Sequence, residues 1–153
     1  MKFLNFVDNL KYGFSIKYPS TWEKKEKLKD VIVVFLAPLE NESDKFRENL
    51  SLMVSNLFMQ TMDLSDYVNF SIDQLREAIL DFRLFEKTQT KISKIPAYKI
   101  VYSGKRKQMN IKIMQHYAIK RNKVYLITYT AEKDKYEMYL KSLQKMIKTF
   151  KIF

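Results

Sequence analysis

The seven residues 31–37, Val-Ile-Val-Val-Phe-Leu-Ala, place the strongest constraint on the fold. The run is rich in β-branched residues and apolar at consecutive positions, whereas successive side chains of a strand point to opposite faces of a sheet. A strand of this composition is buried on both faces. We therefore expect a central strand at residues 31–37, closed by Pro38, with a further layer packed on each face of its sheet.

Two amphipathic segments can supply these layers. In residues 64–81, apolar side chains recur at helical spacing behind Asp63 and Asp66, which are arranged like a capping box. Residues 136–150 repeat this pattern behind Asp134 and Glu137. We therefore expect one helix in mid-chain and a second near the end of the sequence, each covering one face of the sheet.

Much of the remaining chain alternates apolar and polar residues with the period of two that is typical of strands. The strands expected in the main sheet cover residues 49–57, 82–95, 98–104, 111–120 and 124–131. Pro96 is expected to break the second of them, and residues 104–108 to form a hairpin turn with a basic tip. Arg121-Asn122 is expected to be a tight turn, because Asn tolerates positive φ. The last four strands then form an antiparallel meander.

Residues 13–22 contain a short alternating strand that ends in a proline turn and carries the only tryptophan. Pro19 cannot donate to a strand ladder and fixes its own φ, so the chain is expected to turn there and bring Trp22 back over the sheet. Aromatic residues at such spacing usually pack in a core. We therefore interpret Gly13, Tyr18, Pro19 and Trp22 as a structural anchor and not as a binding site.

These elements predict an α+β fold, an α-β-α sandwich whose central, mainly antiparallel sheet is covered by the mid-chain helix and the C-terminal helix. Two segments remain open at this level. Residues 2–7 fit an edge strand or a short helix, and the mixed charges of residues 23–30 fit a solvated loop or ribbon. The length of 153 residues suits a single domain, residues 1–153.

Residue counts exclude most catalytic chemistry. The two glycines stand at positions 13 and 104, whereas phosphate-binding loops and dinucleotide fingerprints need closely spaced glycines. The absence of cysteine excludes disulfides, thiolate metal sites and thiol nucleophiles. The single histidine, His116, is accompanied by no Gly-x-Ser-x-Gly elbow. We expect a protein that is not an enzyme and uses no cofactor; a ligand or metal site built on His116 is the least favoured alternative.

The formal net charge of +11 favours contact with anionic partners. The candidate patch combines Lys105, Arg106 and Lys107 of the expected hairpin with Lys141, Lys145 and Lys148 of the C-terminal helix. Binding of nucleic acid or an anionic surface through these residues is the second hypothesis for function. It is not the favoured one, because only five of the 28 basic residues are arginine, and surface lysines commonly serve solubility.

The beginning of the sequence does not have the uninterrupted apolar segment of a signal peptide, and no run reaches the ~20 apolar residues of a membrane helix. We therefore expect a cytoplasmic protein from the sequence as written. An extracytoplasmic protein is expected if an export signal has been removed.

The segment 13–22 resembles the opening of the PsbP-like family, which comprises the extrinsic photosystem II subunit and its non-photosynthetic prokaryotic relatives. In that family a glycine, an apolar or aromatic residue, an alternating strand, a proline, two variable residues and a tryptophan follow one another. Gly13, Tyr18, Pro19 and Trp22 occupy matching places here. The helix opening Leu-Ser-Asp-Tyr-Val at 64–68 and the ending Met-Ile-Lys-Thr-Phe at 146–150 are similar as well. The resemblance spans nearly the whole chain.

The resemblance implies an α-β-α sandwich with an antiparallel central sheet, a fold also known in a Ran-binding nuclear import factor. Photosynthetic members bind the oxygen-evolving complex, but none of their functional residues is matched in this sequence. The family consists of accessory and binding domains and not of enzymes. The resemblance thus implies a non-catalytic domain that binds a protein partner, unidentified from the sequence, through an exposed strand, a loop or the groove between sheet and helix.

Overall fold

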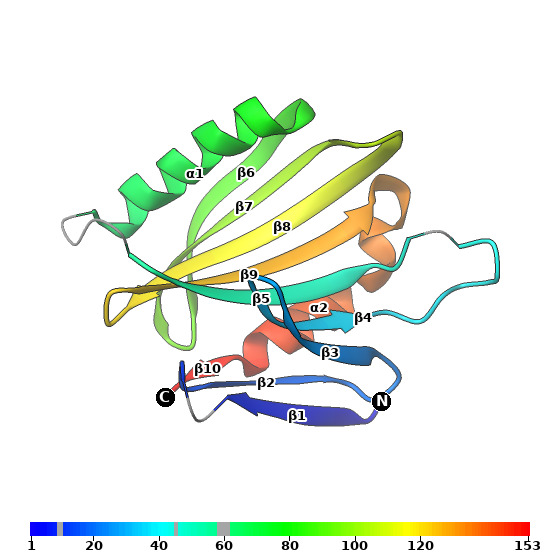
Figure 1. Ribbon diagram of the computed structural model, residues 1–153, viewed down its shortest axis with the longest axis horizontal. Coiled ribbons are helices and arrows are strands. Elements are labelled where there is room, and N and C mark those ends of the chain that lie inside the picture. Colours follow the sequence, from blue (N-terminus) through cyan, green and yellow to red (C-terminus); the bar gives the residue numbers. More distant parts are fainter. Residues whose placement is uncertain (9–10, 45, 58–61) are drawn as a thin grey trace.

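The computed structural model describes residues 1–8, 11–44, 46–57 and 62–153. In these ranges the chain forms two antiparallel sheets and two α-helices (Figure 1). The small sheet has the order β1-β2-β10 and consists of β1 (Phe3–Asp8), β2 (Phe14–Pro19) and β10 (Lys151–Ile152). The large sheet has the order β3-β4-β5-β9-β8-β7-β6 and consists of β3 (Glu23–Leu28), β4 (Val31–Leu36), β5 (Asn49–Asn56), β9 (Lys123–Glu132), β8 (Met109–Lys120), β7 (Ile95–Arg106) and β6 (Leu80–Ile92).

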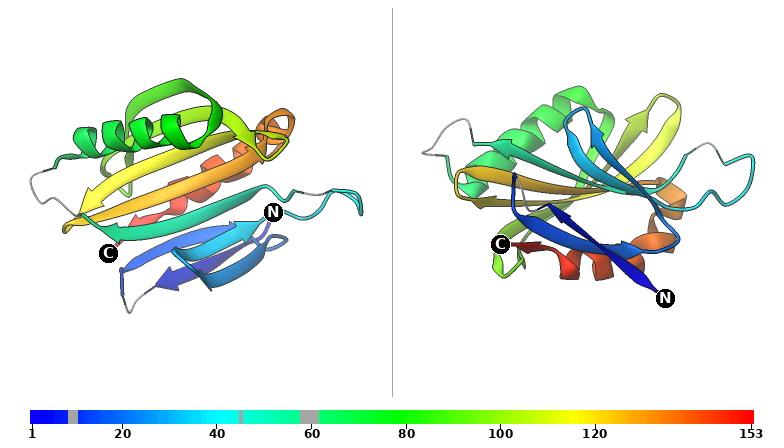
Figure 2. Two further views of the ribbon diagram at one scale, coloured as in Figure 1. Left: turned by 45° about the horizontal axis from the view of Figure 1, so that its top comes forward. Right: turned by 60° about the horizontal axis from the view of Figure 1, so that its bottom comes forward.

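The two helices lie on opposite sides of the large sheet (Figures 1 and 2). Helix α1 (Leu64–Ala78) packs against β6, β7 and β8. Helix α2 (Tyr136–Thr149) follows a short 3-10 turn at Lys133–Lys135 and packs against β9 and against β2 of the small sheet. The predicted α-β-α sandwich with an antiparallel central sheet is therefore confirmed.

Alternation along the strands builds a separate apolar core on each face of the large sheet. In β7, Ile100 and Tyr102 belong to the core under α1, whereas Val101 belongs to the core under α2. The small sheet joins the second core, where Phe14 of β2 lies 5.8 Å from Phe150, measured between ring centroids. The face of the large sheet that carries α2 is thus covered by a helix and a small sheet together.

The chain turns after β2 as the proline predicts. The Trp22 N–H donates to the carbonyl oxygen of Pro19 at 3.0 Å, and the Trp22 side chain is only 6% exposed. Its ring lies edge-on to Tyr139 of α2, with 5.8 Å between centroids. Tyr18 stacks on Phe35 of β4 at 4.5 Å. The corner therefore connects the small sheet to both α2 and the large sheet.

The prediction that residues 31–37 form a central strand is wrong in position. They form β4, which lies one strand in from the β3 edge of the large sheet. Val33 and Phe35 are fully buried in the core under α2, and Val34 on the opposite side is 8% exposed. Composition indicated burial on two faces, but strand order is set by long-range pairing, which the local pattern does not contain.

Pro96 does not break the strand. The turn lies earlier, at Ser93 and Lys94, whose φ angles are 50° and 64°, and Pro96 sits within β7 opposite Lys91. A proline near the start of a strand is compatible with a ladder when its nitrogen is not required as a donor. The meander of β6, β7, β8 and β9 is otherwise as expected.

The first predicted cap is confirmed and the second is wrong. The carboxylate of Asp63 accepts a hydrogen bond from the Asp66 N–H at 2.8 Å, although the helix ends at Ala78 and not at residue 81. Asp134 lies inside the 3-10 turn, so Lys135 becomes the first cap residue of α2 and makes no side-chain capping bond.

The other predicted segments form strands and turns. Residues 2–7 correspond to the edge strand β1, and the charged segment 23–30 supplies strand β3. Arg121 and Asn122 form the tight turn expected of them, with φ angles of 53° and 61°. Gly104 is part of β7, and the hairpin turn lies at Lys107 and the residue after it.

We predict that Trp22→Ala lowers the free energy of unfolding by about 3–5 kcal/mol, because it removes a buried aromatic side chain from the junction of three layers. Denaturant unfolding monitored by far-UV circular dichroism measures the change. Thr21→Ala, an exposed neighbour in the same turn, is the matched control and should leave the midpoint almost unchanged. An unaltered midpoint for the Trp22 variant would contradict its role as an anchor.

Gly104 is required by a close approach between segments. A Cβ atom at this position would overlap Cγ2 of Ile79 and lie 3.1 Å from the carbonyl oxygen of Leu80, just after α1. We expect Gly104→Ala to destabilise the protein by about 1–3 kcal/mol through overpacking. A double-mutant cycle with Ile79→Ala should recover part of this loss, and simple addition of the two losses would show that the contact is not the cause.

Candidate functional site

The main surface groove of interest lies where strands β4 and β5 separate. Their ladder runs from the pair Leu36 and Asn49 to the pair Val33 and Leu52, and it ends there. Val31 and the residue after it then diverge from the last residues of β5. The gap forms a groove of about 990 Å³ between the β3–β4 hairpin, the end of β5 and the end of β1.

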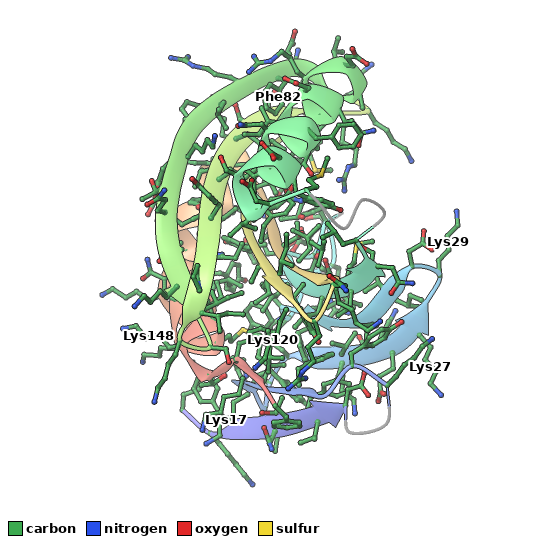
Figure 3. The ribbon with its side chains drawn as sticks, turned by 90° about the vertical axis from the view of Figure 1, so that its left-hand side faces the viewer. Lys17, Lys27, Lys29, Phe82, Lys120 and Lys148 are labelled. Atoms are coloured by element: carbon green, nitrogen blue, oxygen red, sulfur yellow. The ribbon has the colours of Figure 1, made fainter. Side chains whose placement is uncertain are left out.

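The hairpin bends away because of its backbone conformation near the tip. Lys27 and Lys29 adopt φ angles of 57° and 53°. The register places Glu26 opposite Val33 and Leu28 opposite Val31, but Lys27 has no partner in this ladder. Figure 3 shows the hairpin with Lys27 and Lys29 projecting from the body of the protein. The tip of β4 therefore follows β3 and leaves β5.

One backbone edge of β5 is open toward this groove. The Leu57 N–H donates to Asn122 on the β9 side at 2.8 Å, and the Glu48 carbonyl accepts from Ala37 on the β4 side at 2.8 Å. Since backbone groups alternate sides along a strand, the N–H and C=O of Val54 face the β4 side. The described ladder with β4 stops two residues before Val54. The backbone N–H and C=O of Val54 are thus available to pair with an added strand.

The walls of the groove combine apolar side chains with charges of both signs. The apolar and aromatic lining comprises Phe6, Val7, Tyr12, Val31, Ile32, Met53 and Val54, and the charged lining comprises Asp8, Lys11, Glu26, Lys27, Lys29 and Asp30. Val7 is 40% exposed. The ammonium groups of Lys11 and Lys123 lie 5.3 and 5.8 Å from the centre of the Tyr12 ring, within cation–π range. This lining suits a chain segment with an apolar side and polar ends.

None of the residues predicted as a structural anchor is part of the described lining of this groove. Tyr18, Pro19 and Trp22 are buried, and Gly13 adopts a φ of 65° beside Phe153. The groove itself was missed because residues 53–56 have an ordinary strand pattern. Only the end of the β4–β5 ladder, a long-range feature, reveals it.

The residues of the predicted basic patch are exposed but occupy two regions. Lys105 pairs with Asp81 at 3.6 Å, and Arg106 and Lys107 share a surface hollow with Glu132 and Asp134 before α2. Lys141, Lys145 and Lys148 are exposed along α2. At 1.5 Å per residue, Lys148 lies roughly 18 Å along the helix from its first residue. The hairpin cluster therefore adjoins acidic residues at one end of α2, and Lys148 lies toward the other.

His116 is a buried residue of strand β8 and shares the strand face of Met114 and Ala118, which belong to the core under α2. It is 7% exposed, and its Nδ1 atom has no hydrogen-bond partner among the described residues. Burial lowers the pKa of His116 to about 4; the positive charge of Lys99 acts in the same direction, and Glu86 opposes it. Glu86 is itself paired with Lys99 at 2.9 Å. The imidazole is therefore neutral near pH 7 and lines none of the three described cavities.

The part of the chain that the structure describes contains no group of three His, Cys, Asp or Glu side chains placed to hold a metal ion. No helix in the described ranges is long and apolar enough to cross a membrane. The arrangement with the clearest capacity to bind is the groove with the open Val54 edge.

Comparison with known proteins agrees with this fold. The family model for PsbP-like proteins matches residues 2–152, and the chain belongs to the PsbP-like family. A search of curated protein sequences found no significant match.

Three solved structures are similar over almost their whole length. CyanoP, the cyanobacterial PsbP of Synechocystis sp. PCC 6803, has a TM-score of 0.68 at 16% identity, with coverage of 99% of this chain and 92% of that chain. PA94 of Pseudomonas aeruginosa, a putative regulator of unknown function, has a TM-score of 0.70 at 13% identity, with coverage of 97% and 96%. The Ran-binding protein Mog1p of Saccharomyces cerevisiae has a TM-score of 0.66 at 10% identity, with coverage of 99% and 96%. At these identities the likeness shows a shared fold.

The buried His116 predicts a pH-dependent stability. Its pKa of about 4 in the folded chain lies below the value of 6.5 for an exposed histidine, so the unfolded chain binds more protons between these values. The contribution of neutral His116 to the stability of the folded chain is complete above about pH 6.5 and is lost as the pH falls toward 4. Between about pH 7 and 4.5, the protein should lose about 2–3 kcal/mol more stability than His116→Gln. Urea unfolding at both pH values measures this, and equal losses would contradict it.

Proposed function

We propose that this chain is a non-catalytic binding domain that holds an extended segment of a partner protein in the groove between β4 and β5. The observation that carries the proposal is the open backbone edge at Val54, where the β4–β5 ladder has already ended. An extended segment can add to such an edge as a further strand, with main-chain hydrogen bonds supplying affinity.

The lining of the groove supports a segment with alternating side chains. Residues of an added strand would point alternately to the two faces, and Val7 and Ile32 offer apolar contacts beside the open edge. Acidic and basic residues flank these contacts, so charges on the segment would select its direction and register. A segment of four to six residues suffices for such pairing, on the order of a typical strand.

The chemistry of the chain also favours binding over catalysis. His116 is buried and neutral near pH 7, and it lies outside the groove. The groove contains carboxylates and ammonium groups but neither a histidine nor a cysteine. Mog1p, which has the same fold, is a Ran-binding protein, and this supports a protein as the class of partner.

Val54→Pro is the sharpest test of the open edge. Proline removes the N–H that faces the groove but leaves the hydrogen bonds to β9, which are made by the residues on either side of Val54. Val54→Ala is the matched control, because it shortens the side chain and keeps the N–H. Proteins captured from cells of the source organism are identified first, and the affinity of the purified partner for each variant is then measured by calorimetry.

We expect the proline variant to lose at least about tenfold in affinity, since one hydrogen bond and the strand geometry are removed, while the alanine variant binds nearly as the parent does. Hydrogen exchange of the Val54 amide should slow when the partner binds. Equal binding by parent and proline variant, or protection confined to another surface, would contradict the proposal. Circular dichroism and thermal unfolding verify that both variants are folded.

A further inference from the structure

Eight basic residues from separate segments gather at one end of the molecule. Lys17 comes from β2, Lys91 and Lys94 from the β6–β7 turn region, and the others from the β8–β9 turn, the end of α2 and β10. We call this surface the basic end; it consists of Lys17, Lys91, Lys94, Lys120, Arg121, Lys123, Lys148 and Lys151. Figure 3 faces this end and shows Lys17, Lys120 and Lys148 on three different elements.

Specific contacts bring these segments together. The Ile152 N–H donates to the Ser93 hydroxyl at 2.8 Å, which joins β10 to the β6–β7 turn. The Lys17 N–H donates to the Thr149 hydroxyl at 2.8 Å, which joins β2 to the end of α2. Strand β8 pairs with β7, and Ala118 near the end of β8 lies opposite Ala97 near the start of β7, so the β8–β9 turn and the β6–β7 turn lie at the same end of the sheet. The basic end is therefore a product of folding and not of one charged sequence run.

The charges of the basic end are not neutralised by carboxylates. None of the eight takes part in an ion pair among the described residues, whereas six other basic residues do: Lys24, Lys25, Arg47, Lys99, Lys105 and Lys135. Lys123 instead donates to the neutral amide oxygen of Asn56 at 2.9 Å. Asp8 ends β1, and Asp63 lines a hollow with Lys91, so both carboxylates border the surface. The eight positive charges outnumber these two bordering carboxylates, so the surface carries an excess of positive charge.

The kind of cation favours a lipid surface over nucleic acid. Seven of the eight residues are lysine, which acts as a point charge, whereas arginine is preferred for bidentate contacts with phosphates and bases. The lysines are spread over strand ends and turns. Lipid headgroups can diffuse to each of them, but the phosphates of a nucleic acid have fixed spacing. Phe153 follows Lys151 by two residues, is 51% exposed and offers an aromatic contact at the headgroup level.

We propose that the basic end binds the surface of bilayers that contain anionic phospholipids. The protein would lie on the headgroups without insertion of a helix. This surface does not include the residues that line the groove, so lipid binding and partner binding are separable.

The test uses the full chain and vesicles of two compositions, phosphatidylcholine alone and phosphatidylcholine with phosphatidylglycerol. Flotation measures the bound fraction over a series of salt concentrations. We expect binding to the phosphatidylglycerol vesicles only, with a decrease as the salt concentration rises, because exposed charges are screened. Equal binding to both vesicles, or no binding at low salt, would overturn the proposal.

A triple variant locates the surface. Lys17→Glu, Lys120→Glu and Lys148→Glu together should lower partitioning by at least about a hundredfold, since each cation near an anionic surface contributes roughly a factor of five. The matched control changes Lys107, Lys133 and Lys141 to Glu and alters the net charge by the same amount. It should retain most of the binding. An equal loss in both variants would show attraction by net charge alone and would contradict a located surface.

Two further measurements remove the remaining ambiguities. Circular dichroism and thermal unfolding report whether the triple variant is folded. If it is not, the corresponding Lys→Gln variant, which adds no negative charge, takes its place, and the expected loss of vesicle binding is smaller.

Single-stranded RNA and duplex DNA are titrated at the same salt concentration. Tighter binding of either nucleic acid than of the vesicles, with loss in the basic-end variant, would assign the surface to nucleic acid instead.

Discussion

The packing of Phe35 against the small sheet is the interaction on which the other features depend. Its ring stacks on Tyr18 at 4.5 Å and meets Phe6 at 6.3 Å, so one side chain of β4 contacts two strands of the small sheet. This contact holds β4 in the core beside β5 as far as Val33. Beyond that point Ile32 is only partly buried against the core, and Lys27 and Lys29 near the tip of the hairpin adopt positive φ angles. The groove lies where the β4–β5 ladder has ended while the β3–β4 ladder continues to Leu28 and Val31.

The groove and the basic end use different physical principles. An open backbone edge offers directional hydrogen bonds and a defined register, which suit a specific protein segment. Unpaired lysines offer a long-range and nonspecific attraction that depends on salt. The two surfaces approach each other at Tyr12, whose ring centre lies 5.3 Å from the ammonium group of Lys11 in the groove and 5.8 Å from that of Lys123 in the basic end. A protein lying on an anionic surface could thus present the groove at a restricted orientation.

Local sequence patterns predicted what depends on near neighbours. The cap at Asp63, the turn at Pro19 and the tight turn at Arg121 all form as expected, because each involves residues within a few positions. The predictions were wrong where the same local sequence was compatible with a second backbone conformation. Pro96 occupies a ladder position, since the turn is made by Ser93 and Lys94. The capping signal at Asp134 was lost because a 3-10 turn precedes α2.

The sequence by itself determined the layered α-β-α architecture, the antiparallel meander and the scarcity of catalytic groups, because apolar periodicity and residue counts are local or global properties of the chain. The tertiary structure alone decided strand order, the separation of β4 from β5 and the neighbours of each lysine. The candidate basic patch grouped Lys105 with Lys148, whereas in the folded chain the Lys17 N–H donates to the hydroxyl of Thr149, the residue after Lys148. Such contacts depend on pairing and packing between distant segments, whose free energies no short pattern encodes.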